Sequence, residues 1–572
     1  MNRHRSFCLC LCLLLPFALA FAPHDDKNNP KSIGNSTPPG IGGDGPWERL
    51  NMELLSRLPL DEIGGGQANV LGSDCWGWTD PENGTEYAIC GLTNGTSFID
   101  ISDPTDPKYL GKLMTQTGNA AWRDMKVYEN HVFIVSDGNG NHGMQVFDLT
   151  QLRKADRNNP VTFSNTAWYD GGTNSAHNIA INEDTGFAYI VGSDHPDAAG
   201  GLQVVDISDP AAPVHAGVYS GDGYTHDVQV VSYQGPDRDY ESAEIAFASN
   251  EDTVTIVDVT NKGNMTLVSR NPYSATGYTH QGWLSDDHRF FYMGDELDES
   301  SQGGPTRTHI FDCTDLDNPV YMGYYSGQTN SIDHNLYVKG NLMYCGNYSS
   351  GLRVLEIGAN PAELTEIAFF DSYNTDTGVN FNGTWSVYPY YDSGTVLIND
   401  RQNGMFLVKL SPISVSLPQG VPDLVHPDGD VEFTVQVDGF YGTAQSGTGV
   451  LHVDLGTGNG FETWPMNELS SGIYEADFPA SECGSDVTFY VSAQATDGTV
   501  VCNPPNAPLD FYTAMSADSF EIIYLDDMES DLGWSVSGDA SDGQWERGVP
   551  AGAGDRGDPT VDGDGSGSCF LT

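Results

Sequence analysis

Basic residues are scarce in this 572-residue sequence, where 24 Lys and Arg stand against 79 Asp and Glu and give a formal net charge of −55. A surface of this sign repels phosphate backbones, which excludes nucleic acid as a partner. Long helical periodicity is also missing, whereas the sequence contains 66 Gly and 27 Tyr. This composition favours many short strands joined by turns, so we predict an almost all-β protein.

Apolar runs long enough to cross a bilayer are missing beyond the N-terminus. The first 22 residues combine a positively charged start, an apolar stretch and small residues at a cleavage site, which is typical of a signal peptide. We therefore expect a signal peptide over 1–22, a linker over 23–49, and a secreted, extracellular or cell-surface protein without a transmembrane span.

Cysteines are few, and an odd number of them, seven, follows the signal peptide, in a compartment that permits disulfides. Sequence neighbours give three candidate disulfides, namely Cys75 with Cys90, Cys313 with Cys345, and Cys483 with Cys502. Cys569 is left over in the segment 516–572, which resembles the opening of a jelly-roll module that is incomplete. The sequence DGDGSGS in this segment is similar to a calcium loop without its closing acidic residue, so calcium is a weaker hypothesis.

A β-rich run that ends in an acidic residue and a turn recurs along the chain, as in GTSFIDISDP from residue 95 and GLQVVDISDP from residue 201. The acidic positions lie 44 to 58 residues apart, which is the length of a four-stranded propeller blade. Because Asp before Pro is turn chemistry, we assign this motif a structural role. The acidic positions are Asp100, Asp148, Asp206, Asp258, Asp312 and Glu356.

The seventh repeat, GMFLVKL from residue 404, is not followed by a fourth strand of its own. The sequence NMELLSRLPL from residue 51 is similar to NMTLVSRNPY from residue 264, which occupies a fourth-strand position. A propeller often closes with its N-terminal strand, because an unpaired edge invites aggregation. We therefore predict a seven-bladed β-propeller over 50–410, closed by residues near 50–62.

The first residues of the innermost strands should face one channel mouth, because equivalent positions in successive blades point at a common axis. The loops between the second and third strands return to the same face and add carboxylates, among them Glu296. Four imidazoles and one carboxylate then surround the mouth. The innermost strands begin at Trp76, Asp124, His177, His226, His280, His334 and Trp385.

Several imidazoles on one axis favour a transition metal, since neutral imidazole is its commonest protein ligand. An alternative is that these groups hydrogen-bond to each other and to water inside the channel. The candidate ligands for copper, iron or zinc are His177, His226, His280 and His334, with Glu296 or Asp124 as a ligand or as the group that orients one.

These repeats resemble those of the choice-of-anchor B family, which is built from LVIVD repeats. The resemblance covers about 50–410 and includes WRDMKVY, GYTHDVQVV, GYTHQGWL and IDHNLYVKGNLMYCG. It implies a secreted or surface-exposed bacterial propeller whose C-terminal attachment device varies, and it implies no established reaction.

Beyond residue 410 the pattern changes to alternating strands, which predicts an immunoglobulin- or fibronectin-type sandwich over 411–515. Nothing in the sequence matches a nucleophile elbow, a P-loop or an HExxH helix. Our first hypothesis is a binding or scaffold module that takes an extracellular protein or carbohydrate at the acidic mouth. The alternative is a metal-dependent enzyme that uses the four histidines.

Overall fold

The computed structural model describes residues 47–429, 431–519, 546–549 and 569–571. The chain divides into two compact units at Pro412, which we call the ring unit, up to Ser411, and the C-terminal unit, from Pro412 on. The predicted signal peptide and the calcium-loop sequence at 562–568 lie outside the described residues, as does most of the predicted linker.

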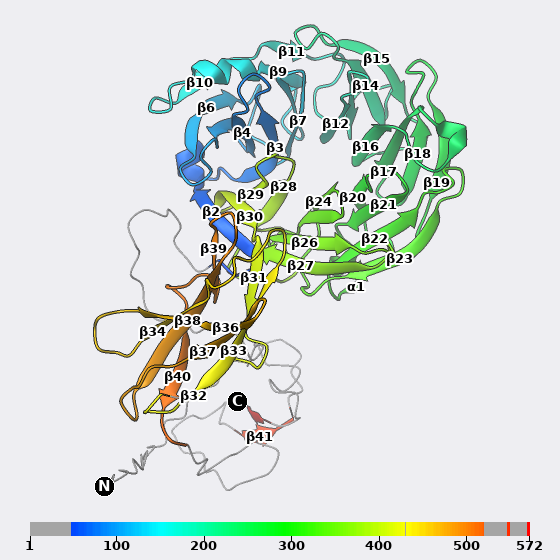
Figure 1. Cartoon of the computed structure of the whole chain (residues 1–572). Helices are drawn as coiled ribbons and strands as arrows, with labels where there is room; N and C mark the ends of the chain where they lie inside the picture. The colour runs from blue at the N-terminus through cyan, green and yellow to red at the C-terminus, as the bar shows by residue number, and fades with distance from the viewer. Residues whose placement is uncertain (1–46, 430, 520–545, 550–568, 572) are drawn as a thin grey trace, which may run out of the picture. The chain divides into compact units, whose positions relative to one another are not determined.

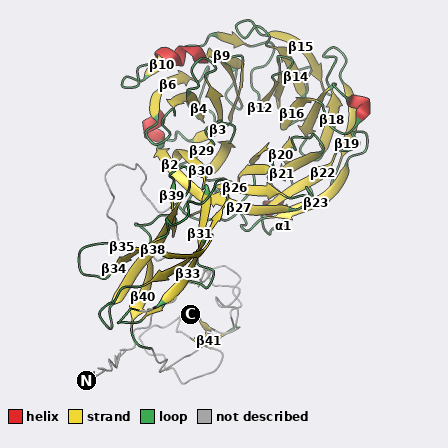
Figure 2. Cartoon of the chain, viewed as in Figure 1, coloured by secondary structure: helices red, strands yellow, loops and turns green. Residues whose placement is uncertain are grey.

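The described part of the chain is almost entirely β-structure, as predicted (Figure 2). Its helical elements are one short α-helix and three 3₁₀ turns, and none of them is long and apolar enough to cross a membrane. They are α1 (Asp298–Gln302), η1 (Leu60–Ile63), η2 (Leu149–Lys154) and η3 (Arg238–Tyr240).

Seven sheets follow one another in the ring unit, and in each the first three strands form an antiparallel meander (Figure 1). The first sheet has β10 added in parallel to β6. The strands of the first four sheets are β3 (Gly72–Thr79), β4 (Glu86–Leu92), β5 (Gly95–Asp100), β6 (Lys108–Met114) and β10 (Val161–Phe163); β7 (Arg123–Tyr128), β8 (His131–Ser136), β9 (Met144–Asp148) and β11 (Ala167–Tyr169); β12 (Asn178–Asn182), β13 (Phe187–Val191), β14 (Leu202–Asp206) and β15 (Val214–Tyr219); β16 (Asp227–Ser232), β17 (Glu244–Ser249), β18 (Val254–Asp258) and β19 (Thr266–Asn271).

The last three sheets repeat this order, and two of them include a strand from the start of the chain. Their strands are β20 (Thr279–Leu284), β21 (Phe290–Asp295), β22 (Arg307–Asp312) and β23 (Val320–Ser326); β24 (Asn335–Lys339), β25 (Leu342–Gly346), β26 (Leu352–Ile357), β27 (Leu364–Phe370) and β1 (Arg49–Leu50); β28 (Thr384–Tyr388), β29 (Thr395–Asp400), β30 (Gly404–Leu410) and β2 (Met52–Leu58).

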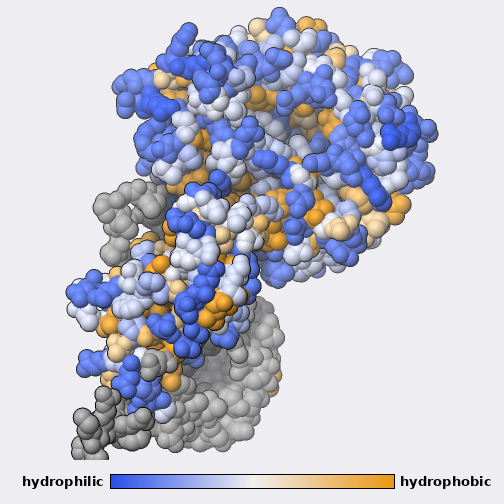
Figure 3. Space-filling view, in the orientation of Figure 1, coloured by the Kyte–Doolittle hydropathy of each residue, from blue (hydrophilic) through white to orange (hydrophobic). Residues whose placement is uncertain are grey.

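The seven first strands contact one another in chain order, and the last of them, β28, contacts β3 again. The sheets therefore form a closed cycle around a common centre (Figure 1). The predicted closing strand is confirmed, because β2 pairs antiparallel with β30 as the fourth strand of the last sheet. Hydrophilic residues predominate on the face of the ring unit drawn in Figure 3.

Turn chemistry explains the acidic residue at the end of the repeated run. Asp100 Oδ1 accepts hydrogen bonds from the backbone N–H and the hydroxyl of Ser102, at 3.0 and 2.7 Å. The same carboxylate-to-backbone bond to the residue two positions later recurs, as the sequence predicted. It is made by Asp148, Asp206, Asp258 and Asp312 to Thr150, Ser208, Thr260 and Thr314.

Neighbouring sheets of the ring unit pack through apolar side chains. One buried cluster joins Val191 of β13 to Ala248 of β17, and the Phe247 and Phe291 rings stack between the fourth and fifth sheets at 5.5 Å. The alternation of apolar residues along each strand therefore fills the wedge between adjacent sheets.

The disulfides predicted for Cys75 with Cys90 and for Cys313 with Cys345 are not present, and all four residues carry buried free thiols. Cys75 and Cys90 lie opposite each other on β3 and β4 within one apolar cluster. Cys313 and Cys345 belong to two different clusters. These thiols act as small apolar side chains, and burial raises their pKa.

The C-terminal unit contains two sheets over one apolar cluster that includes Val435, Leu451 and Phe489. The pairing of Cys483 with Cys502 stays a prediction. β41 (Glu546–Gly548) pairs with β42 (Cys569–Leu571), and most of the predicted jelly-roll segment beyond Ser519 is outside the described residues. The two sheets are β31 (Ile413–Ser416), β33 (Glu432–Gly439), β37 (Ile473–Asp477) and β36 (Asn467–Ser470); and β32 (Leu424–Val425), β40 (Tyr512–Ser516), β38 (Asp486–Gln494), β34 (Val450–Asp454), β35 (Glu462–Pro465) and β39 (Val500–Asn503).

Removal of a buried side chain from the closing strand tests how far the ring depends on it. Met52 of β2 is buried in the cluster between the last two sheets, whereas Leu50 is exposed. Met52→Ala should lower the free energy of unfolding by about 2–5 kcal/mol, because it opens a cavity. Leu50→Ala is the control and should change it by no more than about 0.5 kcal/mol. Urea denaturation followed by Trp fluorescence measures both, and equal effects would argue against closure by β2.

Candidate functional site

Four imidazoles lie side by side at one end of the first strands. His177, His226 and His334 directly precede β12, β16 and β24, and His280 is the second residue of β20. The centroids of successive rings are 4.4, 4.2 and 4.5 Å apart. The structure therefore brings the four predicted histidines together, and we call them the histidine arc.

Hydrogen bonds to the backbone of the next sheet set the orientation of two of these rings. Nδ1 of His226 lies 2.9 Å from the carbonyl oxygen of His280, and Nδ1 of His334 lies 2.5 Å from that of Trp385. Because a carbonyl only accepts, Nδ1 carries the proton in both rings. Nε2 of each neutral ring is then left with a lone pair.

Burial keeps three imidazoles of the arc, those of His226, His280 and His334, neutral. It lowers the pKa of His280 to about 3, with a further contribution from His177, and it lowers the pKa of His334 to about 3, with a further contribution from His280. Burial and the neighbouring imidazoles likewise lower the pKa of His226 well below its usual range. Neutral imidazole is the form that binds transition metals.

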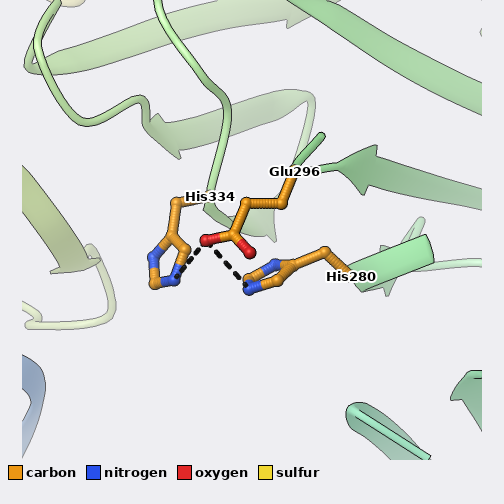
Figure 4. Close-up of side chains that lie close together, drawn as sticks. All are labelled: His280, Glu296 and His334. Atoms are coloured by element: carbon orange, nitrogen blue, oxygen red, sulfur yellow. Dashed lines mark ion pairs between the residues drawn. The ribbon is translucent and has the colours of Figure 1, made fainter. Parts of the chain in front are cut away.

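Glu296, which follows β21, adds a carboxylate to the arc (Figure 4). Its Oε1 lies 3.8 Å from Nε2 of His280 and 3.7 Å from Nε2 of His334, and it accepts a hydrogen bond from the Tyr348 hydroxyl at 2.8 Å. A carboxylate oxygen thus faces the lone pair of His334. A cation between these two atoms would be bound by both.

The spacing of these three atoms fits a transition metal. The ligand atoms of His280, Glu296 and His334 all lie within 4.8 Å of one another. Ligands of a tetrahedral zinc ion with bonds of about 2.0–2.1 Å lie about 3.4 Å apart. The observed separations of 3.7 and 3.8 Å reach that value after shifts of a few tenths of an ångström. Two imidazoles and one carboxylate suit zinc, copper or iron.

Three predicted ligands, His177, His226 and Asp124, are not part of this group. Nδ1 of His177 lies 3.0 Å from Oδ2 of Asp137, so its ring is oriented by a different carboxylate. Asp124, predicted as a ligand or as the group that orients one, stays a prediction. Its carboxylate forms an ion pair with Lys126 at 2.6 Å and accepts the backbone N–H of Ile179 at 2.7 Å.

Sequence reasoning missed Tyr348 and Asp137, the two groups that orient ligands of the arc. Asp137 lies in the SDGNGNHG loop, which the sequence analysis placed at this face of the ring. The hydrogen bond of Asp137 to His177 was not predicted. Tyr348 lies between β25 and β26, also a loop between second and third strands.

The arc lines a small pocket of about 10 Å³ that is continuous with solvent. Trp122 is 45% exposed beside it, and the guanidinium of Arg401 lies 5.0 Å from the Trp385 ring. The pocket therefore combines aromatic surface with polar groups. It is lined by Trp122, Arg123, His177, Asn178, His226, His280, His334, Asn335 and Trp385.

A second set of charges lies on the first strands themselves. Lys126 forms ion pairs with Asp124 and, at 3.8 Å, with Asp74, and its ammonium lies 4.6 Å from the Trp76 ring. The ammonium of Lys126 is therefore close to three carboxylates, those of Asp74, Asp124 and Asp227. Burial and the charge of Asp124 raise the pKa of Asp227 to about 7.

The raised pKa of Asp227 predicts a dependence of stability on pH. An unfolded Asp ionises near pH 3.9, so the stability of the folded state falls as pH rises from about 4 through 7. Asp227→Asn removes this loss and should raise the thermal midpoint at pH 8 more than at pH 5. The control is Asp184→Asn, at an exposed position. Calorimetry at the two pH values measures the difference, and a gain of the same size at both would contradict the assignment.

Comparison with known proteins links the chain to a repeat and to solved structures, while no curated protein matches it. A functionally unknown protein from Desulfotomaculum acetoxidans is 13% identical with a TM-score of 0.37, over 52% of this chain and 85% of that one. A hypothetical selenium-binding protein from Sulfolobus tokodaii is 11% identical with a TM-score of 0.34, over 51% of this chain and 80% of that one. Three segments of the ring unit, residues 86–115, 174–220 and 245–271, match the model of the LVIVD repeat.

Proposed function

We propose that the ring unit is a seven-bladed β-propeller and that the C-terminal unit contains an immunoglobulin- or fibronectin-type sandwich. The closed cycle of first strands and the completion of the last sheet by β2 support the propeller. Two sheets over one apolar cluster support the sandwich. In this reading each repeat of the sequence is one blade, and the histidine arc lies at one mouth of the central channel.

We further propose that the protein is a secreted or cell-surface binding module that takes its ligand at the channel mouth. The leader-like N-terminus supports export, and the net charge of −55 supports an acidic, self-repelling surface. The pocket beside the arc offers the binding surface, with the exposed Trp122 as an aromatic contact. An extracellular protein or carbohydrate is the partner class.

One observation carries the role of the mouth, namely that Nε2 of His280 and Nε2 of His334 converge on one carboxylate oxygen of Glu296, with the lone pair of His334 facing that oxygen. A bound zinc, copper or iron ion would satisfy all three atoms at once. His280, Glu296 and His334 would bind the ion, and Tyr348 would orient the carboxylate. Such a hydrogen bond to a ligand typically tightens binding of the metal.

With His280, Glu296 and His334 as its ligands, a tetrahedral ion would keep a fourth position for a donor atom from outside the protein, such as one of a bound partner. The second candidate function is a metal-dependent enzyme, in which an ion held by these residues would supply Lewis-acid chemistry. The open pocket at the arc is the observation that favours this alternative.

Removal of one ligand tests the metal site. Tyr348→Phe should weaken zinc binding about 10–100-fold, because it removes the hydrogen bond that orients Glu296. His334→Ala should weaken it further, since a ligand itself is lost. Isothermal titration of the metal-free protein with zinc, copper and iron salts measures the affinity, and elemental analysis of the untreated protein identifies the resident ion.

A histidine outside the arc provides the control for this experiment. His426 lies in the C-terminal unit and pairs with Asp518 at 3.0 Å, so His426→Ala should leave zinc affinity unchanged. Equal zinc binding by the wild-type protein and His334→Ala would exclude a metal at the arc. Stoichiometric metal combined with no hydrolysis or oxidation of a substrate panel would favour the binding module over the enzyme.

A further inference from the structure

Three buried carboxylates lie together next to the arc but outside it. Asp298 and Glu299 begin α1 after β21, and Asp333 precedes β24 of the next sheet. They are 1%, 1% and 5% exposed, and one oxygen from each lies within 4.8 Å of the others. Exposed acidic groups are solvated by water. Three carboxylates buried together are costly unless a partner compensates their charge.

Each carboxylate of this set keeps an oxygen without a hydrogen-bond partner. Oδ2 of Asp298 lies 3.1 Å from the guanidinium of Arg307 and 3.4 Å from Nε2 of His309, whereas Oδ1 has no hydrogen-bond partner. Oε1 of Glu299 accepts a hydrogen bond from the backbone N–H of Arg307 at 3.0 Å, whereas Oε2 has no hydrogen-bond partner. Buried polar atoms are normally satisfied, so unsatisfied oxygens in a cluster point to a missing ligand.

Asp333 completes the set from the neighbouring sheet. Its Oδ1 is also buried without a partner, and its Oδ2 lies against Gly294, where an added Cβ would be only 2.1 Å away. The glycine of β21 thus provides the space in which the Asp333 carboxylate reaches the other two. A side chain at position 294 would displace the Asp333 carboxylate from this position.

The charges of this set are not balanced by protein groups alone. The only guanidinium paired with the three carboxylates in the described part of the chain is that of Arg307. This one guanidinium balances at most one of the three buried negative charges, so the set needs a further cation or protons. A divalent ion would replace these protons and satisfy three oxygens at once.

We propose that Asp298, Glu299 and Asp333 form a calcium site that joins the fifth and sixth sheets of the ring unit. The three unpartnered atoms are all carboxylate oxygens, which are hard ligands. Oxygens bound to one calcium ion at about 2.3–2.6 Å lie at most about 5 Å apart, which the 4.8 Å limit satisfies. Waters and backbone carbonyls supply the remaining ligands of the roughly six to eight that calcium takes.

This site is distinct from the metal at the histidine arc, but the two are adjacent in sequence. Asp333 precedes His334, and Asp298 follows Glu296 by two residues. Calcium would thus fix both segments that supply ligands to the arc. The proposal does not depend on the proposed function, because calcium and zinc are titrated separately and the two sites share no ligand.

Calcium titration of the full chain, after removal of metals with a chelator, tests the site. Wild-type protein should bind calcium, with a Kd on the order of 10⁻⁴ M or tighter, and its thermal midpoint should rise by several degrees in about 1 mM CaCl₂. Asp333→Asn and Glu299→Gln should each lose this binding and this shift. Without calcium the two variants should be at least as stable as the wild type at pH 8, since each removes an uncompensated buried charge.

Asp315→Asn is the matched control, because Asp315 belongs to an exposed acidic group with Asp237 and Asp317. It should retain the calcium shift of the wild type. The proposal is overturned if wild-type protein shows no calcium-dependent shift, or if the shift survives in both Asp333→Asn and Glu299→Gln. If the two variants are more stable than the wild type and calcium does not affect the wild type, the three carboxyl groups share a proton and do not bind calcium.

Discussion

The ring unit depends on hydrogen bonds between polar side chains of one first strand and the backbone of the next. Adjacent first strands belong to different sheets, so no β-ladder joins them. Gln281 instead donates to the carbonyl of Leu336 and accepts the N–H of the same residue, both at 3.0 Å. The Nδ1 atoms of His226 and His334 make equivalent bonds to the following sheet. These contacts bridge the sheets where apolar packing ends.

This bridging has a consequence for the chemistry of the arc. A neutral imidazole that uses Nδ1–H to join two sheets has its lone pair on Nε2, on the other side of the ring. The structural role of His334 therefore prepares it as a ligand for a metal. His334 would thus both join two sheets and bind the proposed ion. Substitution of such a histidine consequently affects both packing and binding.

The periodic features of the fold were predictable from sequence, because each repeat reports the same local physics. The all-β composition, the Asp turn caps and the closing strand β2 all follow from patterns that recur or match in register. The position of the four histidines at one face also followed from the repeat. Their mutual distances did not, since these depend on the packing of whole sheets.

The features that sequence reasoning got wrong or missed are those that depend on single contacts between sheets. Asp124 occupies an equivalent place in its repeat, and the contacts of its carboxylate with Lys126 and with the backbone of Ile179 were missed. Cys75 and Cys90 lie opposite each other on paired strands as free thiols, so proximity in sequence did not predict a bond. The carboxylate set of Asp298, Glu299 and Asp333 brings two repeats together and has no local signature.

Hardness of the ligands separates the two proposed ions. The arc offers two imidazole nitrogens and one oxygen, a set that binds zinc or copper far more tightly than calcium. The carboxylate set offers oxygens alone, and its ligands come from two sheets, so an ion there opposes their separation. A transition metal at the arc would instead lie beside the solvent-connected pocket. An ion at the histidine arc would therefore be accessible to a partner, whereas an ion at the carboxylate set would stabilise the structure around the arc.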